Sequence, residues 1–252
     1  MENNKNLKIK LKWRRPESVE YPKVWHTFMS RDLDSDNLVE YRIEDVTPSN
    51  AEDVLKHMKA YFIHDEPIAC ALGCSNDDLY YEDYKNTWDA AIDQGTALVC
   101  YKAGSDVIVG AHMTFVQTKA DNYAQQVTDS CRYEPWNQKV ELFKKLSSSF
   151  CPFQYYGVDE ILSELGLSVS REYRGRGIGV QMLAVHKLLC KEYGLKIAHG
   201  SFTSEFSDAC ADKVGFVTNT AASYQDFWKQ HPEHSWMQNI KVKQFSKRSL
   251  LI

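Results

Sequence analysis

The stretch LSVSREYRGRGIGVQML, from Leu167 to Leu183, places three glycines at alternate positions between two apolar runs. The run before the glycines is typical of a strand, and the run after them repeats at helical spacing. A strand that enters a helix through glycines leaves several backbone N–H groups unpaired and pointing at one place, where the helix dipole adds partial positive charge. The stretch therefore predicts an anion site, most often one for phosphate. The alternative is a tight connection that binds nothing.

The residues within this turn limit the anions that it could bind. Glycine lets a diphosphate touch the backbone, and Arg174 and Arg176 would supply mobile charge around it. A Walker loop needs GxxxxGKS or GxxxxGKT, and no such string occurs. The dinucleotide fingerprint GxGxxG fails at its third glycine, and the position about 20 residues later falls near Ala198 and His199 instead of an acidic residue. Neither nucleotide motif is satisfied.

Strand and helix patterns alternate along the rest of the chain. Residues 7–14 alternate apolar and basic side chains, which predicts a strand with one wet face, and a basic stripe for nucleic acid is the alternative. A capping-box pattern begins at Ser49, and Pro67 should end the helix that follows. The patterns predict strands at 41–46, 96–101, 106–116, 161–169, 195–202 and 238–245, and helices at about 51–62, 79–92, 139–146, 180–193 and up to 213–216.

This order of elements is mixed α/β, and it predicts one domain over residues 1–252 with a mixed sheet flanked by helices. Residues 1–38 would form an N-terminal extension. Residues 119–153 break the rhythm and are interpreted as an insertion or lid, with a polar loop ahead of the helix at 139–146.

Composition excludes several classes of protein. The formal net charge of -4 gives no global reason to expect nucleic acid or an anionic membrane as a partner. The start lacks the apolar core of a signal peptide, and no run approaches the roughly 18 apolar residues of a membrane helix. Seven scattered cysteines do not form a disulfide framework, so we expect a cytoplasmic protein. Cys70, Cys74 and His64 lack a second ligand pair, so no metal is expected.

Three separated segments together resemble one family. Arg174-x-x-Gly177-x-Gly179, between a strand and a helix, resembles motif A of the GNAT acetyltransferase superfamily. The segments FIHDEPI at 62–68 and SFTSEFSDACADKVGF at 201–216 resemble segments of the insect arylalkylamine N-acetyltransferases. The resemblance covers residues from about 40 to 245, and the combination of segments makes it specific.

The resemblance implies a GNAT acyl-CoA N-acyltransferase fold with acetyl-CoA as cosubstrate and no metal. The diphosphate would lie on the glycine turn, and the pantetheine arm would pair with the backbone of residues 166–169. The cofactor-binding residues that this implies are Leu167, Ser168, Val169, Arg174, Gly175, Arg176, Gly177, Ile178, Gly179 and Val180.

Acetyl transfer to an amine needs a base, because an alkylamine with a pKa near 10.4 is almost entirely protonated at neutral pH. Glu66 matches the catalytic glutamate of the family, and the adjacent Asp65 is the alternative base. From the residues alone, either would be a solvated carboxylate at a helix end. His112, His186 and His199 lie within strand or helix patterns and are interpreted as core or surface residues.

The departing thiolate also needs a proton. Many members of the superfamily place a tyrosine near the start of the last helix, but Ala211 occupies that position here. Ser207 matches a serine that the insect enzymes are thought to use, and Thr203 is a weaker match for a second one. The alternative for Ser207 is a helix cap.

The resemblance implies direct transfer of acetyl, in a ternary complex on a monomer, to a small arylalkylamine such as dopamine, tyramine, octopamine, serotonin or tryptamine. Aromatic residues in the two segments expected to flank the acceptor agree with this: Tyr80, Tyr81, Tyr84, Trp88, Phe153, Tyr155 and Tyr156. The alternatives are that these rings hold a cation or that they are ordinary core residues. Agmatine or a polyamine is the alternative acceptor, because four acidic residues lie in the same region: Asp77, Asp78, Glu82 and Asp83. A non-catalytic acyl-CoA-binding module is the third hypothesis.

Overall fold

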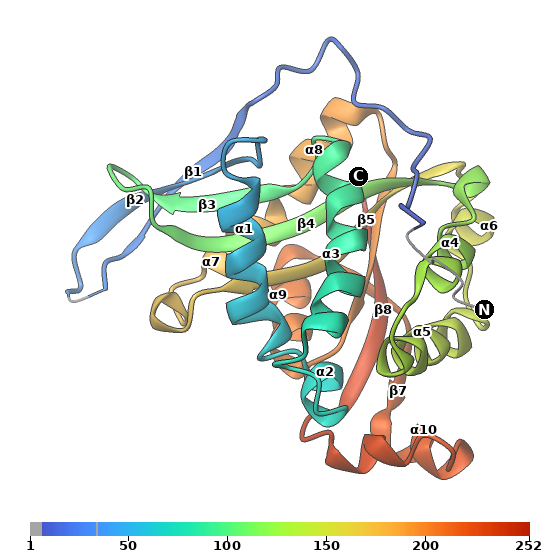
Figure 1. Cartoon of the computed structure of the whole chain (residues 1–252). Helices are drawn as coiled ribbons and strands as arrows, with labels where there is room; N and C mark the ends of the chain where they lie inside the picture. The colour runs from blue at the N-terminus through green and yellow to red at the C-terminus, as the bar shows by residue number, and fades with distance from the viewer. Residues whose placement is uncertain (1–6, 34) are drawn as a thin grey trace.

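The computed structural model describes residues 7–33 and 35–252 and contains one eight-stranded sheet (Figure 1). The strands lie in the order β1-β2-β3-β4-β5-β6-β8-β7, and every neighbouring pair is antiparallel except β5 and β6. This mixed sheet confirms the expected fold class. The strands are β1 Val24–Arg31, β2 Leu38–Asp45, β3 Leu98–Lys102, β4 Ile108–Thr118, β5 Glu160–Val169, β6 Ile197–Phe202, β7 Val217–Ser223 and β8 Gln244–Leu251.

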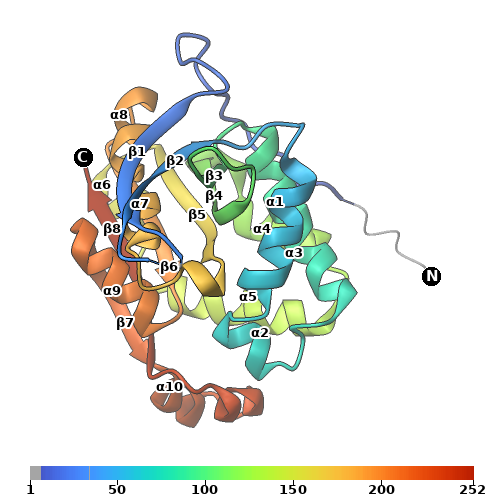
Figure 2. The same ribbon diagram turned by 90° about the vertical axis from the view of Figure 1, so that its left-hand side faces the viewer.

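Helices cover both faces of the sheet (Figure 2). On one face lie α1 (Ala51–His57), which continues as a π-helical turn over Met58–Ile63, α3 (Asp78–Asp93), α4 (Tyr123–Ser130) and α5 (Glu134–Ser147). On the other face lie α7 (Ile178–Ala184), α8 (His186–Tyr193) and α9 (Glu205–Val214). The short helices α2 (Pro67–Ala71), α6 (Pro152–Tyr156) and α10 (Tyr224–Gln230) complete the set.

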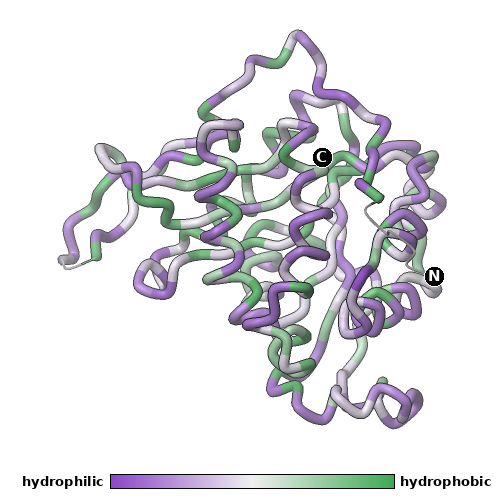
Figure 3. Tube along the Cα trace, in the orientation of Figure 1, coloured by the Kyte–Doolittle hydropathy of each residue, from purple (hydrophilic) through white to green (hydrophobic). Residues whose placement is uncertain are grey.

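Two apolar cores follow from this arrangement, one on each side of the sheet. The side chains of β3 and most of β4 are buried because these central strands are covered on both faces, and their hydrophobic character is visible in Figure 3. A third and smaller apolar cluster joins α2 and α5 to α10 and β8. It includes Ile68, Leu142, Tyr224 and Phe245. This third cluster fixes α2, and therefore the residue that precedes it, against the C-terminal part of the chain.

The strand predicted at 7–14 is wrong, although the predicted alternation of buried side chains is present. Ile9, Leu11 and Trp13 are buried, and the chain there is extended without pairing to a strand. The backbone N–H groups of Lys10 and Lys12 donate instead to side-chain oxygens of Gln126 and Asp121, at 2.8 and 2.9 Å. These side-chain oxygens accept the hydrogen bonds that the carbonyl groups of a neighbouring strand would accept in a sheet. Residues 1–6 of the predicted N-terminal extension lie outside the described residues, and its last part contains β1.

Residues 119–138 form helices where a polar loop was predicted. A 3₁₀ turn at Lys119–Asp121 leads into α4, and α5 begins at Glu134, five residues before the predicted helix. The sequence is polar on average, but Val127, Trp136 and Val140 are buried in the apolar core on the side of the sheet that α1 and α3 cover. The few apolar residues at helical spacing therefore outweigh the polar majority, and the segment packs against the domain.

The end of the chain also differs from the prediction. Residues 235–239 form a 3₁₀ turn and the last strand begins at Gln244, not at 238. Ile240 and Val242, which suggested the strand, are partly buried in the third cluster. The strand β7 was not predicted because its alternating small side chains are largely exposed. The other predicted strands and helices are confirmed within a few residues. Within residues 7–33 and 35–252, no helix is both long enough and apolar enough to cross a membrane.

Candidate active site

The sheet opens between its two parallel strands. β5 and β6 pair only at Leu162 with Ala198 and at Ser163 with His199. β6 then stays paired with β8 as far as Phe202, while β5 continues to Val169 paired only with β4. In the described chain, the β6 side of β5 therefore has no strand partner from residue 164 to residue 169. This is the segment where the sequence predicted an extended ligand.

A bulge in β5 lies at the start of this opening. Leu165 and Gly166 together face the single residue Met113 of β4, because the register shifts there. Gly166 has φ of +121°, and a Cβ at this position would lie 2.5 Å from the ring of Phe62. Only glycine fits such a backbone with an aromatic ring against it. The bulge thus brings the π-helical turn that follows α1 into contact with the free edge of β5.

The glycine turn has the predicted form of strand, turn and helix. Gly175 and Gly177 have φ of +75° and +78°, and Gly177 is the N-cap of α7. A Cβ at either position would meet no atom within 4 Å, so open space lies in front of the turn. The glycines are required by the left-handed backbone and leave a surface that a ligand could approach.

The two arginines of the turn are held by protein groups. The guanidinium of Arg176 donates to four backbone carbonyls and is a brace of the turn, so the expectation that its charge is mobile is wrong. Those carbonyls belong to Asp32, Leu33, Glu172 and Arg174. Arg174 donates to the Val169 carbonyl at 3.0 Å and pairs with Asp65 at 2.5 Å. Its side chain is 44% exposed, which leaves it accessible to a ligand in the open space.

Asp65 and Glu66 are neighbours in the sequence with different surroundings. Partial burial raises the pKa of Asp65, but hydrogen bonds and charge from Arg171 and Arg174 outweigh it, so the pKa lies below the ordinary value. Asp65 is therefore held as an ionised partner of arginines, which makes it a poor base.

Glu66 is buried, with 4% of its surface exposed, and so is not the solvated helix-end carboxylate that residue patterns alone suggested. It is the N-cap of α2, where Pro67 takes the first helical position, and its Oε2 accepts the N–H of Ala69 at 2.9 Å. The same oxygen lies 3.5 Å from Nζ of Lys139, on α5. Its other oxygen, Oε1, is buried without a hydrogen-bond partner. A buried carboxylate oxygen without a partner is a candidate proton acceptor.

Aromatic rings connect Glu66 with the opening in the sheet. Nζ of Lys139 lies 4.1 Å from the centroid of the Tyr84 ring, and Tyr84 packs edge-on against Phe62 at 5.6 Å. Phe62 in turn contacts Trp88, whose indole N–H donates to the Leu165 carbonyl at 2.9 Å. Of the rings predicted near an acceptor, Tyr84 and Trp88 lie here and Tyr80 packs on Tyr84. Phe153, Tyr155 and Tyr156 lie instead on α6 and before β5.

The hydroxyl groups expected as acids lie at the start of α9. Ser204 caps this helix and forms a reciprocal capping box with Ser207, whose hydroxyl also donates to the Ser204 carbonyl at 2.8 Å. Ser207 is thus part of the capping box of α9, although the N-cap residue itself is Ser204. The carbonyl of Thr203 accepts a hydrogen bond from the hydroxyl of Tyr224 at 3.1 Å. Ala211 is fully buried in the apolar core on the side of the sheet that α7, α8 and α9 cover.

No family model matches the sequence. Among solved structures, the chain is similar to an insect protein provisionally assigned as arylalkylamine N-acetyltransferase 7, from the yellow fever mosquito Aedes aegypti. The identity is 32% and the TM-score 0.87, over 95% of this chain and 99% of the mosquito chain. The chain belongs to the insect arylalkylamine N-acetyltransferase family of GNAT enzymes. It is therefore an acyltransferase.

More distant structures share the fold of this acetyltransferase. Arylalkylamine N-acetyltransferase 2 of Aedes aegypti has 18% identity and a TM-score of 0.73, over 84% of this chain and 99% of its own. A Drosophila melanogaster polyamine N-acetyltransferase that catalyses the formation of N-acetylagmatine has 16% identity and a TM-score of 0.69, over 84% of this chain and 100% of its own. The same fold is thus found with both acceptor classes that the sequence left open.

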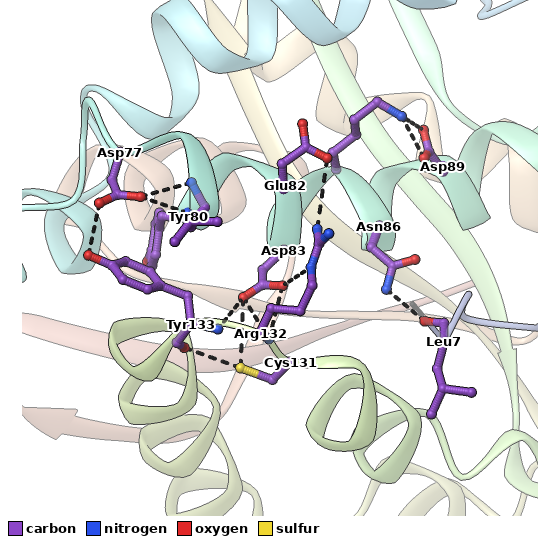
Figure 4. A network of polar contacts seen from close by, with 12 residues as sticks. Leu7, Asp77, Tyr80, Glu82, Asp83, Asn86, Asp89, Cys131, Arg132 and Tyr133 are labelled. Carbon is purple, nitrogen blue, oxygen red and sulfur yellow. Dashed lines mark hydrogen bonds and ion pairs between the residues drawn. The ribbon is translucent and has the colours of Figure 1, made fainter. Parts of the chain in front are cut away.

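The acidic residues that the sequence predicted near an acceptor are engaged in a polar network around α3 (Figure 4). Asp77 caps α3 through the N–H groups of Leu79 and Tyr80 and accepts the Tyr133 hydroxyl at 2.8 Å. Asp83 is buried and accepts the N–H groups of Arg132 and Tyr133.

The two other acids of this region, Asp78 and Glu82, pair with Lys59 and Arg132 near the surface, at 2.7 and 3.8 Å. The network therefore leaves none of these four carboxylates unpaired inside the protein.

A buried cluster on the opposite face of the sheet joins His112, Glu164 and His186. Their ligand atoms lie within 4.8 Å of one another, but the two imidazole rings stack at 4.8 Å with planes only 20° apart. Lone pairs lie in the ring planes, so two nearly parallel stacked rings do not point at one metal ion in this arrangement. Burial raises the pKa of Glu164 to about 7, and a Cβ on Gly200 would collide with its carboxylate. With His199, these histidines are core residues, as predicted.

The cluster predicts how stability depends on pH. Burial lowers the pKa of His186 from 6.5 to about 3, and neither ring nitrogen has a hydrogen-bond partner. Between pH 6.5 and about pH 3 the His186 ring binds a proton in the unfolded chain but not in the folded chain. The contribution of the neutral ring to the free energy of unfolding is therefore present above pH 6.5 and is lost as the pH falls. His186→Phe should flatten the slope of unfolding free energy between pH 6 and 4 by up to about 1.4 kcal/mol per pH unit. Urea unfolding at several pH values measures it, and an unchanged slope would show that His186 is not buried neutral.

Two residues of the site were missed from the sequence. Lys139 interrupts an apolar stripe of α5 formed by Trp136, Val140 and Phe143, and a lysine within such a stripe indicates pairing with a buried acid. Tyr224 lies far from motif A along the chain, and no local pattern marks its contact with Thr203.

Proposed function

We propose that this acyltransferase transfers acetyl from acetyl-CoA to the primary amine of a small, singly charged arylalkylamine, acting as a monomer. The proposed acceptors are dopamine, tyramine, octopamine, serotonin and tryptamine. The choice of acceptor rests on the carboxylates of Asp77, Asp78, Glu82 and Asp83, which are all paired with protein groups. Agmatine or a polyamine would need unpaired carboxylates to bind its distal charge. The 32% identity to the mosquito protein supports the same choice.

The cofactor would occupy the open side of β5 and the glycine turn. The diphosphate would meet the backbone N–H groups from Gly175 to Val180, with Arg174 turning from Asp65 towards it. The pantetheine arm would pair with the backbone of residues 166–169, where β6 has diverged. The brace that Arg176 forms keeps the turn in its open shape.

In the proposed reaction, Glu66 accepts the proton of the incoming ammonium at Oε1, the oxygen without a partner. The amine nitrogen attacks the thioester carbon in a ternary complex, the new N–C bond forms, and the C–S bond breaks. Ser207 and Thr203, at the start of α9, are the proposed proton donors to the departing thiolate, and the donor regains its proton from the nitrogen, which loses its second proton as the amide forms. Ser207 shares its hydroxyl with the cap of that helix.

A panel of amines with acetyl-CoA, followed by release of free thiol, tests this function. We expect steady turnover with tyramine and tryptamine, and N-acetyl products by mass spectrometry. Acetyl-CoA binding without turnover of any amine would favour the non-catalytic module. Turnover confined to agmatine or spermidine would favour the second acceptor class.

A further inference from the structure

One lysine is buried in the apolar face of α5. Lys139 has 6% of its surface exposed, and its neighbours on the same helix face, Trp136, Val140 and Phe143, pack into the apolar cores. A lysine is almost never buried to this degree unless it is paired. We therefore expect the Lys139 ammonium to have a partner inside the protein.

The Lys139 ammonium lies in an aromatic cage beside Glu66. Nζ is 4.1 Å from the ring centroid of Tyr84, 5.5 Å from that of Trp136 and 5.6 Å from that of Phe143. Its hydrogen bond to Glu66 Oε2, at 3.5 Å, is long. Such a cage with one carboxylate is how proteins recognise an ammonium group. The cation-binding surface nearest to Glu66 is thus already occupied by the chain itself.

Charge counting around Glu66 gives the consequence. An ionised Glu66 and a protonated Lys139 form a pair with no net charge before any acceptor arrives. Burial lowers the pKa of Lys139, while the carboxylate of Glu66 opposes this shift. The nearby acids Asp77 and Asp83 are already hydrogen-bonded by Tyr133 and Arg132. A second positive charge on the acceptor would find no carboxylate to pair with in this low-dielectric region.

We propose that Lys139 is a specificity determinant, whose fixed ammonium excludes acceptors that carry a second positive charge. This inference rests on the proposed acetyl transfer and names the device that selects its acceptor class. A monoamine brings one charge to the free Oε1 of Glu66, where the proton is removed. A diamine of the same length must place a second ammonium beside the rings and the charge of Lys139.

The experiment compares n-pentylamine with 1,5-diaminopentane, which differ only in the second amino group. In the wild-type protein we expect kcat/KM for pentylamine to exceed that for the diamine at least about tenfold, after division by two for its two reactive ends. In Lys139→Met, which removes the charge at similar length, the ratio should fall to about threefold or less. Lys139→Arg is the matched control that keeps the charge, and it should keep the wild-type preference.

The ratio is measured on one preparation, so a smaller folded fraction in Lys139→Met cancels, and Lys139→Gln serves if the methionine variant does not fold. An unchanged ratio in the uncharged variants would overturn the proposal, as would an equal loss of preference in Lys139→Arg. If no amine is acetylated, the proposed function fails by itself. Calorimetry then measures the binding of the two amines to the wild-type protein and to Lys139→Met. An equal preference for pentylamine in both proteins would reject the proposal that Lys139 selects the acceptor.

Discussion

Glu66→Gln is expected to lower kcat for amine acetylation by roughly 10²–10⁴-fold, the usual contribution of a general base. The amide can still accept the N–H of Ala69 and cap α2, so the backbone around residue 66 should persist. It cannot accept the ammonium proton at the position of Oε1. Binding of acetyl-CoA should change little, because the partners of the Glu66 side chain are Ala69 and Lys139 and not residues of the glycine turn. Stopped-flow thiol release and calorimetry measure the two quantities separately.

Asp65→Asn is the matched control, since it makes the same chemical change one residue away. Exposed ion pairs such as those of Asp65 with Arg171 and Arg174 contribute about 0–1 kcal/mol, so kcat should stay within about fivefold of wild type. A pH–rate profile that keeps its acidic limb in Glu66→Gln would mean that another group is the base. A larger loss in Asp65→Asn than in Glu66→Gln would reverse the assignment of the two residues.

Gly177→Asp is expected to weaken acetyl-CoA binding at least about tenfold, or about 1.4 kcal/mol. Gly177 has φ of +78°, which side chains rarely adopt, and the space in front of it is open. An aspartate would place its side chain and a negative charge in that space, where the diphosphate is proposed to lie. Isothermal titration calorimetry measures the affinity, and a thermal melt shows whether the fold survives.

Gly177→Ala separates the two causes of that loss. Alanine imposes the same backbone strain but adds only a methyl group and no charge, so it should weaken binding less than aspartate does. Equal effects of alanine and aspartate would assign the loss to the backbone alone. Wild-type affinity in Gly177→Asp would place the diphosphate elsewhere.

The glycine turn was predictable because its information is local. Glycine spacing, the strand before it and the helix after it all lie within Leu167–Leu183, and the backbone of Gly175 and Gly177 requires glycine. The extended segment at 7–14 shows the limit of this approach. Its periodicity correctly gave the burial of Ile9, Leu11 and Trp13, although Leu7 is exposed. Its hydrogen-bond partners, Gln126 and Asp121, lie more than 100 residues away. A pattern with a period of two cannot distinguish a strand neighbour from such side chains.

The surroundings of Glu66 depend even more on tertiary structure. Lys139 is 73 residues away in the sequence, and the packing of α5 on α2 and α3 brings its ammonium to the carboxylate. The acids of α3 likewise looked free in the sequence, because their partners Arg132 and Tyr133 lie in a segment predicted as loop. The sequence therefore left both acceptor classes open, and these contacts are the basis of the proposed choice between them.

A competition assay tests the choice of acceptor most directly. An equimolar mixture of tyramine, tryptamine, agmatine and spermidine is incubated with limiting acetyl-CoA, and the acetylated products are quantified by mass spectrometry to give the ratios of kcat/KM. The occupied carboxylates of α3 and the fixed charge of Lys139 predict that acetyltyramine and acetyltryptamine together exceed the other products at least about tenfold. A majority of acetylagmatine or acetylspermidine would contradict a site for singly charged aryl amines.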